Sequence, residues 1–162
     1  MTLRCIALVA AASLVGSAAA QADWNVQDTS SQLDNSRTYI AHLDSTNKMP
    51  NSLGVPENAT IVVRCKSGKL SLYIVWPTFM GLDGETVKWK FDSGDIWQQD
   101  WDNSSDGTAT FVRDQQKFLK DMAAAAKLVV DAPPYQSEPI EAVFDLKGAN
   151  EVVNTAVAAC PT

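Results

Sequence analysis

Apolar and polar residues alternate in several short runs along the chain, and this pattern predicts strands. The clearest run is IVVRCKSGKLSLYIVW at 61–76, where two apolar segments flank Ser67-Gly68. A two-residue turn at that position predicts a hairpin, because its register brings apolar residues opposite one another on one face. The expected apolar pairs are Cys65–Leu70, Val63–Leu72 and Ile61–Ile74. Cys65 should therefore point into the core.

Other runs with the same alternation predict strands at 24–27, 37–43, 85–92, 96–101, 108–112 and 140–146. Segments rich in Pro, Gly, Asn and Ser predict loops at 44–60 and 131–139. Between the strands at 85–92 and 96–101, a tight turn at Ser93-Gly94 would set Trp89 opposite Gln98. We therefore expect a bulge or a longer turn there.

Two segments near the C-terminus have helical periodicity instead. Residues 113–130 carry Phe118, Met122, Ala125 and Val129 on one stripe, and residues 148–160 carry Val153, Val157 and Cys160 on another. The expected fold is therefore α+β. It consists of an antiparallel sheet or sandwich-like core with two helices in the C-terminal half.

The first residues have the pattern of a secretory signal peptide, with Arg4, an apolar run and then small residues. Two cleavage positions fit, before Gln21 or before Asp23, and the alternative is a buried N-terminal helix of the mature fold. We predict a cleaved signal peptide at 1–22 and a single domain at 23–162. The mature protein would then be periplasmic or secreted and would contain no integral membrane segment.

Cleavage would remove Cys5 and leave Cys65 and Cys160 as the remaining thiols. An even number of cysteines in an oxidising compartment indicates a disulfide first. Two separate buried thiols are the alternative. A metal site or a cysteine nucleophile would depend on His42, the one histidine in the sequence, and we predict no metal.

Composition excludes several classes of partner. The chain has 46% hydrophobic and 20% charged residues, which is typical of a globular protein. Its net charge of −6 argues against binding to nucleic acid or to an anionic membrane. The acidity could steer a basic partner, and it also serves solubility.

The candidate chemical motifs are weak. DNSSDG at 102–107 resembles the start of a calcium loop, but Arg113 stands where that loop needs glutamate, so a polar turn is the better interpretation. Trp97 and Trp101 would share one face of a strand, either as a ligand platform or as core residues. His42 lies at a strand end, and no nucleophile motif accompanies it. We expect no enzyme and no cofactor.

Several stretches, taken in order, resemble the TagO/VasI (EvfG) family of proteins associated with bacterial type VI secretion. They are SSQLDNSRT at 30–38, VVRCKSGKLSLYIVW at 62–76, Trp101-x-x-Ser104-x-Asp106-x-x-Ala109-x-Phe111, FLKDM at 118–122, AVFDLKGA at 142–149 and the terminal cysteine. The resemblance implies a small periplasmic accessory protein without established catalytic residues. It also suggests that Trp101, Ser104, Asp106 and Phe111 form one turn-and-strand unit.

These observations lead to a functional hypothesis. We expect a non-enzymatic periplasmic accessory or binding protein that supports a type VI secretion system through protein contacts. The alternative is an inhibitor or immunity protein against a cell-wall hydrolase or toxin. Candidate binding residues are Trp97, Trp101, Ser104 and Asp106.

Overall fold

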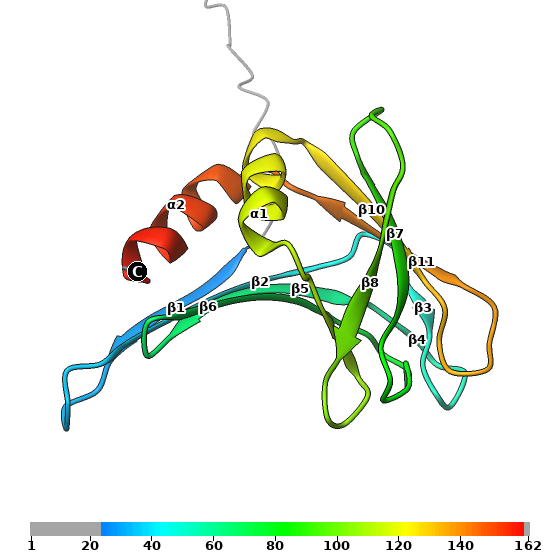
Figure 1. Cartoon of the computed structure of the whole chain (residues 1–162), viewed down its shortest axis with the longest axis horizontal. Helices are drawn as coiled ribbons and strands as arrows, with labels where there is room; N and C mark the ends of the chain where they lie inside the picture. Colours follow the sequence, from blue (N-terminus) through cyan, green and yellow to red (C-terminus); the bar gives the residue numbers. More distant parts are fainter. Residues whose placement is uncertain (1–23, 161–162) are drawn as a thin grey trace, which may run out of the picture.

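A computed structural model describes residues 24–160, so the predicted signal peptide lies outside the described residues. The strands are β1 (Asn25–Ser30), β2 (Arg37–Asp44), β3 (Met49–Pro50), β4 (Pro56–Glu57), β5 (Thr60–Lys66), β6 (Lys69–Val75), β7 (Glu85–Phe91), β8 (Trp97–Asn103), β9 (Ala109–Phe111), β10 (Lys127–Ala132) and β11 (Ile140–Asp145). The helices are α1 (Gln115–Ala124) and α2 (Ala149–Ala159). This is the expected α+β fold, with both helices in the C-terminal half (Figure 1).

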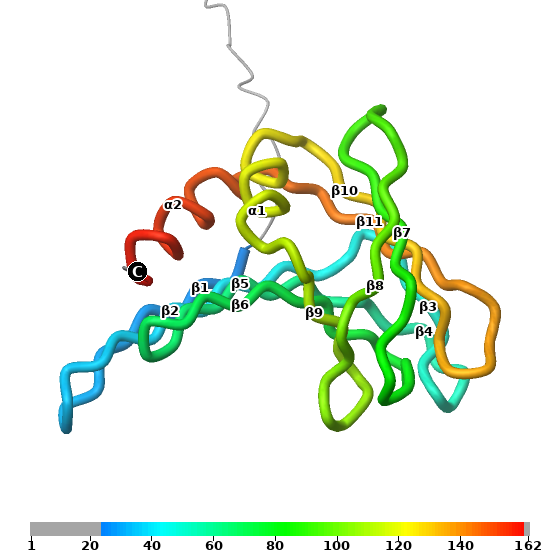
Figure 2. Tube along the Cα trace, in the orientation of Figure 1, coloured from blue at the N-terminus to red at the C-terminus, as the bar shows by residue number. Residues whose placement is uncertain are grey.

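Nine of these strands in residues 24–160 form one antiparallel sheet in the order β1-β2-β5-β6-β9-β8-β7-β10-β11. The sheet curls, so that β11 returns to the segment that follows β2 (Figure 2). There the N–H of Thr46 donates to the carbonyl of Val143 at 2.7 Å, and the N–H of Val143 donates to the Asn47 side chain at 2.8 Å. These bonds satisfy backbone groups on the outer edge of β11.

The core lies inside the curl and under the two helices. Helix α2 packs on β2 and β5 and against α1. The hydroxyl of Tyr39, on β2, donates to the carbonyl of Val152 on α2 at 3.4 Å. Each strand of the central hairpin contributes fully buried apolar side chains, among them Ile61 and Leu72. Burial of this apolar face is the main stabilising contribution to the fold.

The central hairpin is confirmed in register. Strands β5 and β6 pair Cys65 with Leu70, Val63 with Leu72 and Ile61 with Ile74. Ser67 and Gly68 both have positive φ angles, as a tight hairpin turn requires. The longer turn between β7 and β8 is also confirmed, because Trp89 lies opposite Trp97 instead of Gln98.

The prediction that the helix continues to Val129 is wrong. Helix α1 ends at Ala124, and Ala125 is already extended with φ −98° and ψ 155°. A carboxylate oxygen of Asp92 accepts the N–H groups of Ala126 at 3.0 Å and Lys127 at 2.9 Å. These donors are therefore bound to a neighbouring loop, and the chain turns into β10 between β7 and β11.

The stripe predicted on the last helix is partly wrong. Val153 and Cys160 are buried, but Val157 is 51% exposed. The buried stripe continues instead through Ala156 and Ala159, whose small side chains let the helix approach the sheet closely. That approach is needed for Cys160 to reach β5.

Candidate binding site

Cys65 and Cys160 form a disulfide, with an S–S distance of 2.05 Å and a Cα–Cα distance of 5.6 Å. The bridge joins β5 to the residue after α2 and spans 95 positions of sequence. The predicted pairing is confirmed, and the alternative of two separate thiols is wrong. Neither of these cysteines is free to act as a nucleophile or a metal ligand. A disulfide is consistent with an oxidising compartment.

The two candidate tryptophans have different environments. Trp101 is 0% exposed and packs against the rings of Trp89 and Phe118, with centroid distances of 5.3 and 5.6 Å. Trp97 is 50% exposed, and the ammonium of Lys117 lies 4.6 Å from its ring centroid. Trp101 therefore belongs to the core under α1. Trp97 is the residue of the pair that a ligand could reach.

Ser104 and Asp106 stabilise the turn between β8 and β9. The Ser104 hydroxyl accepts the N–H of Ala109 at 2.9 Å, and a carboxylate oxygen of Asp106 accepts the Thr108 hydroxyl at 2.9 Å. A hydrogen bond from Ser104, followed by those from Thr108, lowers the pKa of Asp106. Their polar atoms are thus engaged within the turn. Arg113, which stands where a calcium loop would need glutamate, forms an ion pair with Asp102 at 2.9 Å.

The remaining candidates do not gather into a reactive centre. His42 lies on β2, between Asn25 and Val62 in the sheet register. In residues 24–160, no three side chains among His, Cys, Asp and Glu come together as a metal site would require. Neither α1 nor α2 is long and apolar enough to cross a membrane.

Four loops gather at one end of the sheet, at the lower right of Figure 2. We call this region the loop end, and it comprises residues 51–55, 76–84, 104–108 and 133–139. Hydrogen bonds join its loops. The N–H of Met80 donates to the carbonyl of Gly107 at 2.7 Å, and the N–H of Tyr135 donates to the carbonyl of Phe79 at 3.2 Å. Residues 76–84, 104–108 and 133–139 are therefore connected to one another.

Gly107 is required for this contact between loops. Its φ of +67° lies in the left-handed region, and a Cβ atom there would meet the Phe79 ring at 2.3 Å and the Gly81 carbonyl oxygen at 2.7 Å. Any other residue would push the two loops apart.

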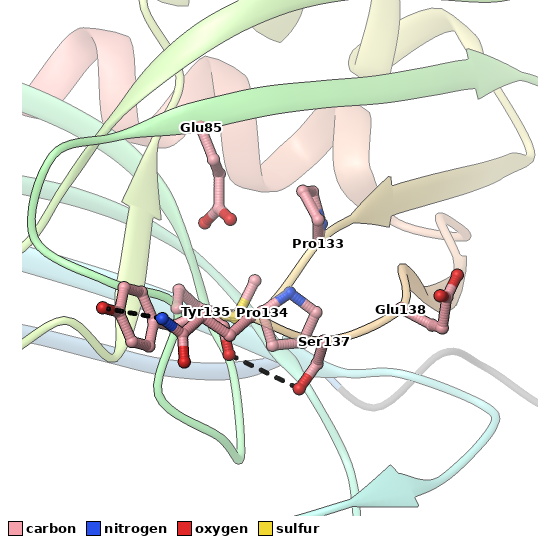
Figure 3. Close-up of a pocket in the computed structure, with 8 residues that line it drawn as sticks. Glu85, Pro133, Pro134, Tyr135, Ser137 and Glu138 are labelled. Carbon is pink, nitrogen blue, oxygen red and sulfur yellow. Dashed lines mark hydrogen bonds between the residues drawn. The ribbon is translucent and has the colours of Figure 1, made fainter.

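The loop end contains an open pocket of about 730 Å³. Met80 and Glu85 line one side, and residues 133–138 line the other. Figure 3 shows the Glu85 carboxyl directed from β7 toward the segment that carries Tyr135. The side chain of Gln136 donates to the Tyr135 hydroxyl at 3.2 Å, and the Ser137 hydroxyl donates to the Tyr135 carbonyl at 3.4 Å. Both bonds lie within the segment that forms this wall of the pocket, and the bond from Tyr135 to Phe79 joins the segment to the neighbouring loop.

Among the residues that line this pocket, Glu85 has a pKa that is shifted from its ordinary value. Burial raises its pKa from the ordinary value of 4.5 to about 7, and a hydrogen bond with Asn103 offsets only part of that rise. Oε1 of Glu85 and Oδ1 of Asn103 are buried without a hydrogen-bond partner, as is the indole Nε1 of Trp101, the residue paired with Glu85. A strongly perturbed carboxyl in a pocket marks a candidate functional site.

Sequence reasoning missed Glu85, although the strand pattern contained a signal. Successive residues of a strand alternate between its two faces. Val87, Trp89 and Phe91 share the apolar face of β7, and Glu85 continues the same alternation by two positions. An acidic residue on an otherwise apolar face is the anomaly that could have identified it.

We expect Glu85→Gln to raise stability at pH 8 and to flatten the pH dependence of folding. The folded protein retains a proton on Glu85 at pH values where the unfolded chain has lost it, so wild-type stability falls between about pH 4.5 and 7. A change of one in pKa corresponds to about 1.4 kcal/mol. Solvent reaches part of this side chain, so we expect only about 1–2 kcal/mol in urea unfolding.

Glu151→Gln is the matched control, because it removes the same charge from an exposed position of α2. Asp34, with a pKa lowered to about 2, contributes stability that is lost only as the pH falls below about 4, outside this window. If the free energy of unfolding depended on pH in the same way for Glu85→Gln and wild type, the raised pKa of Glu85 would be contradicted.

Comparison with known proteins bears on the fold. The sequence matches no family model and no curated protein. The crystal structure of invasion associated protein B from Bartonella henselae is similar, with a TM-score of 0.55 over 86% of this chain and 95% of that chain. This fold has a precedent. Sequence identity is 12%, so the similarity extends to the fold alone.

Proposed function

We propose that this protein is a non-enzymatic accessory protein of the bacterial periplasm that works through contacts with other proteins. The observation that carries the proposal is the loop end, where hydrogen-bonded loops lie beside a pocket lined by Met80, Glu85 and residues 133–138. Leu53, Phe79, Leu82 and Tyr135 are all exposed there. Apolar side chains grouped on loops are typical of protein-binding surfaces.

The resemblance to the TagO/VasI family supports a more specific role. In that role, the protein would assist a type VI secretion assembly from the periplasmic side. The predicted signal peptide and the disulfide agree with that compartment. The proposal assigns no chemistry to Glu85, because neither described cysteine nor His42 lines its pocket.

Site-specific photo-cross-linking in cells that naturally produce the protein would test this role. A photoreactive phenylalanine analogue would replace Leu82, which is 62% exposed at the loop end. The matched control is Val157, which is similarly exposed on α2 at 51%. We expect position 82 to capture an envelope or secretion component and position 157 not to capture it.

Two other results would change the conclusion. Absence of any adduct specific to position 82 would contradict a binding role for the loop end. Capture of a cell-wall hydrolase or a toxin would instead favour the inhibitor or immunity function, for which a compact acidic domain with a disulfide is suited.

A further inference from the structure

The Glu85 carboxyl lines this pocket, and its Oε1 has no hydrogen-bond partner. In its ionised form a carboxylate accepts hydrogen bonds only. Burial makes that ionised form unfavourable. A ligand that brings positive charge and N–H donors into the pocket would favour it.

The ionisable groups that line the pocket include acidic residues and no basic ones. The residues that line it include two carboxylates, Glu85 and Glu138, and no lysine, arginine or histidine. Tyr135 supplies an aromatic ring in the wall, and such rings attract cations over their faces. Acceptors, negative charge and an aromatic ring together select a cationic group with several N–H donors.

The size and surroundings of the pocket favour a protein as the source of that group. A volume of about 730 Å³ is ample for one long side chain. Outside the pocket, Phe79 and Leu82 remain exposed, and the Phe79 ring lies 5.8 Å from that of Tyr135. A small free amine would leave these apolar side chains uncovered.

We propose that this pocket receives an arginine or lysine side chain of a protein partner, in a segment whose neighbouring residues are apolar. The inference rests on the proposed function and names the chemistry of its partner. The cation pairs with the Glu85 carboxylate and lies beside the Tyr135 ring. The flanking apolar residues cover Phe79 and Leu82, as the rim around a buried anchor does in other protein interfaces.

A peptide titration followed by nuclear magnetic resonance tests the inference directly. The probes are acetyl-Ala-Leu-Arg-Leu-Ala-amide, the same peptide with neutral citrulline in place of arginine, and acetyl-arginine amide alone. We expect the arginine peptide to give saturable shifts of the Tyr135 and Gln136 amides and the Trp101 indole N–H. The citrulline peptide and the single amino acid should each bind at least about tenfold more weakly.

Variants distinguish binding in the pocket from nonspecific attraction of the cationic peptide to an acidic protein. Glu85→Gln should weaken the arginine peptide about tenfold. Urea unfolding of this variant, which we expect to be more stable than wild type at pH 8, shows whether unfolding is the cause. Glu151→Gln, which removes the same charge from α2, should bind as the wild type does. Tyr135→Phe should retain binding, because the ring remains.

The inference is overturned if the two peptides bind equally, if Glu85→Gln binds like the wild type, or if no saturable shift occurs up to about 5 mM peptide. Equal binding of acetyl-arginine amide and the peptide would contradict the claim that the cationic group belongs to a protein partner. Failure here is distinguishable from failure of the proposed function. Cross-linking at position 82 can succeed although Glu85 is dispensable, and the peptide can bind although no envelope partner is captured.

Discussion

Replacing both bridged cysteines, Cys65→Ala with Cys160→Ala, is expected to lower the free energy of unfolding by about 2–4 kcal/mol. The bridge spans 95 positions, so its removal frees a large loop in the unfolded chain. Alanine is the suitable replacement because Cys65 is 0% exposed, and a serine hydroxyl there would be buried. Urea unfolding without reductant measures the change.

The position of the bridge predicts where the loss is first seen. Apart from the disulfide, α2 is held to the sheet mainly by apolar packing and by the bond from Tyr39 to Val152. Amide hydrogen exchange should therefore accelerate in α2 before it does in β5. Wild-type protein in reductant should behave like the double variant. A loss below about 0.5 kcal/mol would show that packing alone holds the helix.

Trp101→Ala is expected to cost about 3–5 kcal/mol, whereas Trp97→Ala should cost less than about 1 kcal/mol. Trp101 is completely buried among the rings of Trp89 and Phe118, so its removal leaves a cavity under α1. Trp97 loses only a half-exposed contact and the Lys117 interaction. Thermal and urea unfolding of the two variants, side by side, give the comparison.

A third variant refines this result. Trp101→Phe retains an aromatic ring and removes the indole N–H, which has no hydrogen-bond partner. We expect it to lose less than about half as much stability as Trp101→Ala. Equal losses for Trp97→Ala and Trp101→Ala would contradict the division between a core tryptophan and an exposed one.

Glu85 has opposite effects on folding and on the proposed binding. Its carboxylate is destabilising above about pH 7 because it is partly buried with an unpaired oxygen. The same carboxyl lines the pocket, where a cationic partner would favour its ionised form. Locally unfavourable groups of this kind are expected at functional sites, since they are retained for binding and not for stability.

The local pattern of apolar and polar residues was sufficient to predict much of the fold. The alternation in 61–76 predicts the central hairpin to the residue, because a one-residue slip would turn every apolar side chain of the strand outward. The cysteine count, with a signal peptide expected, predicts the bridge between Cys65 and Cys160. Alternation also predicts β11, where Ala142 and Phe144 face the core.

Less of the candidate site could be predicted from the sequence. Trp97 and Trp101 share one strand face, and periodicity cannot tell which of them lies under a helix. That distinction depends on α1, whose Phe118 covers Trp101 and whose Lys117 reaches Trp97. The pocket at Glu85 depends on a loop some fifty positions away, residues 133–138.

By itself, the sequence determined the features that depend on neighbouring residues: the register of the central hairpin and the polar turn within 102–107, of which residues 104–107 form the turn and Asp102 and Asn103 belong to β8. The tertiary structure alone decided where α1 ends and what Glu85 faces. Residues 125–130 fit a helix by periodicity, but the Asp92 carboxylate binds the N–H groups of Ala126 and Lys127, and β7 and β11 supply strand partners. Such long-range hydrogen bonds override a local helical preference, because they satisfy the same backbone groups while burying Leu128 and Val130 completely.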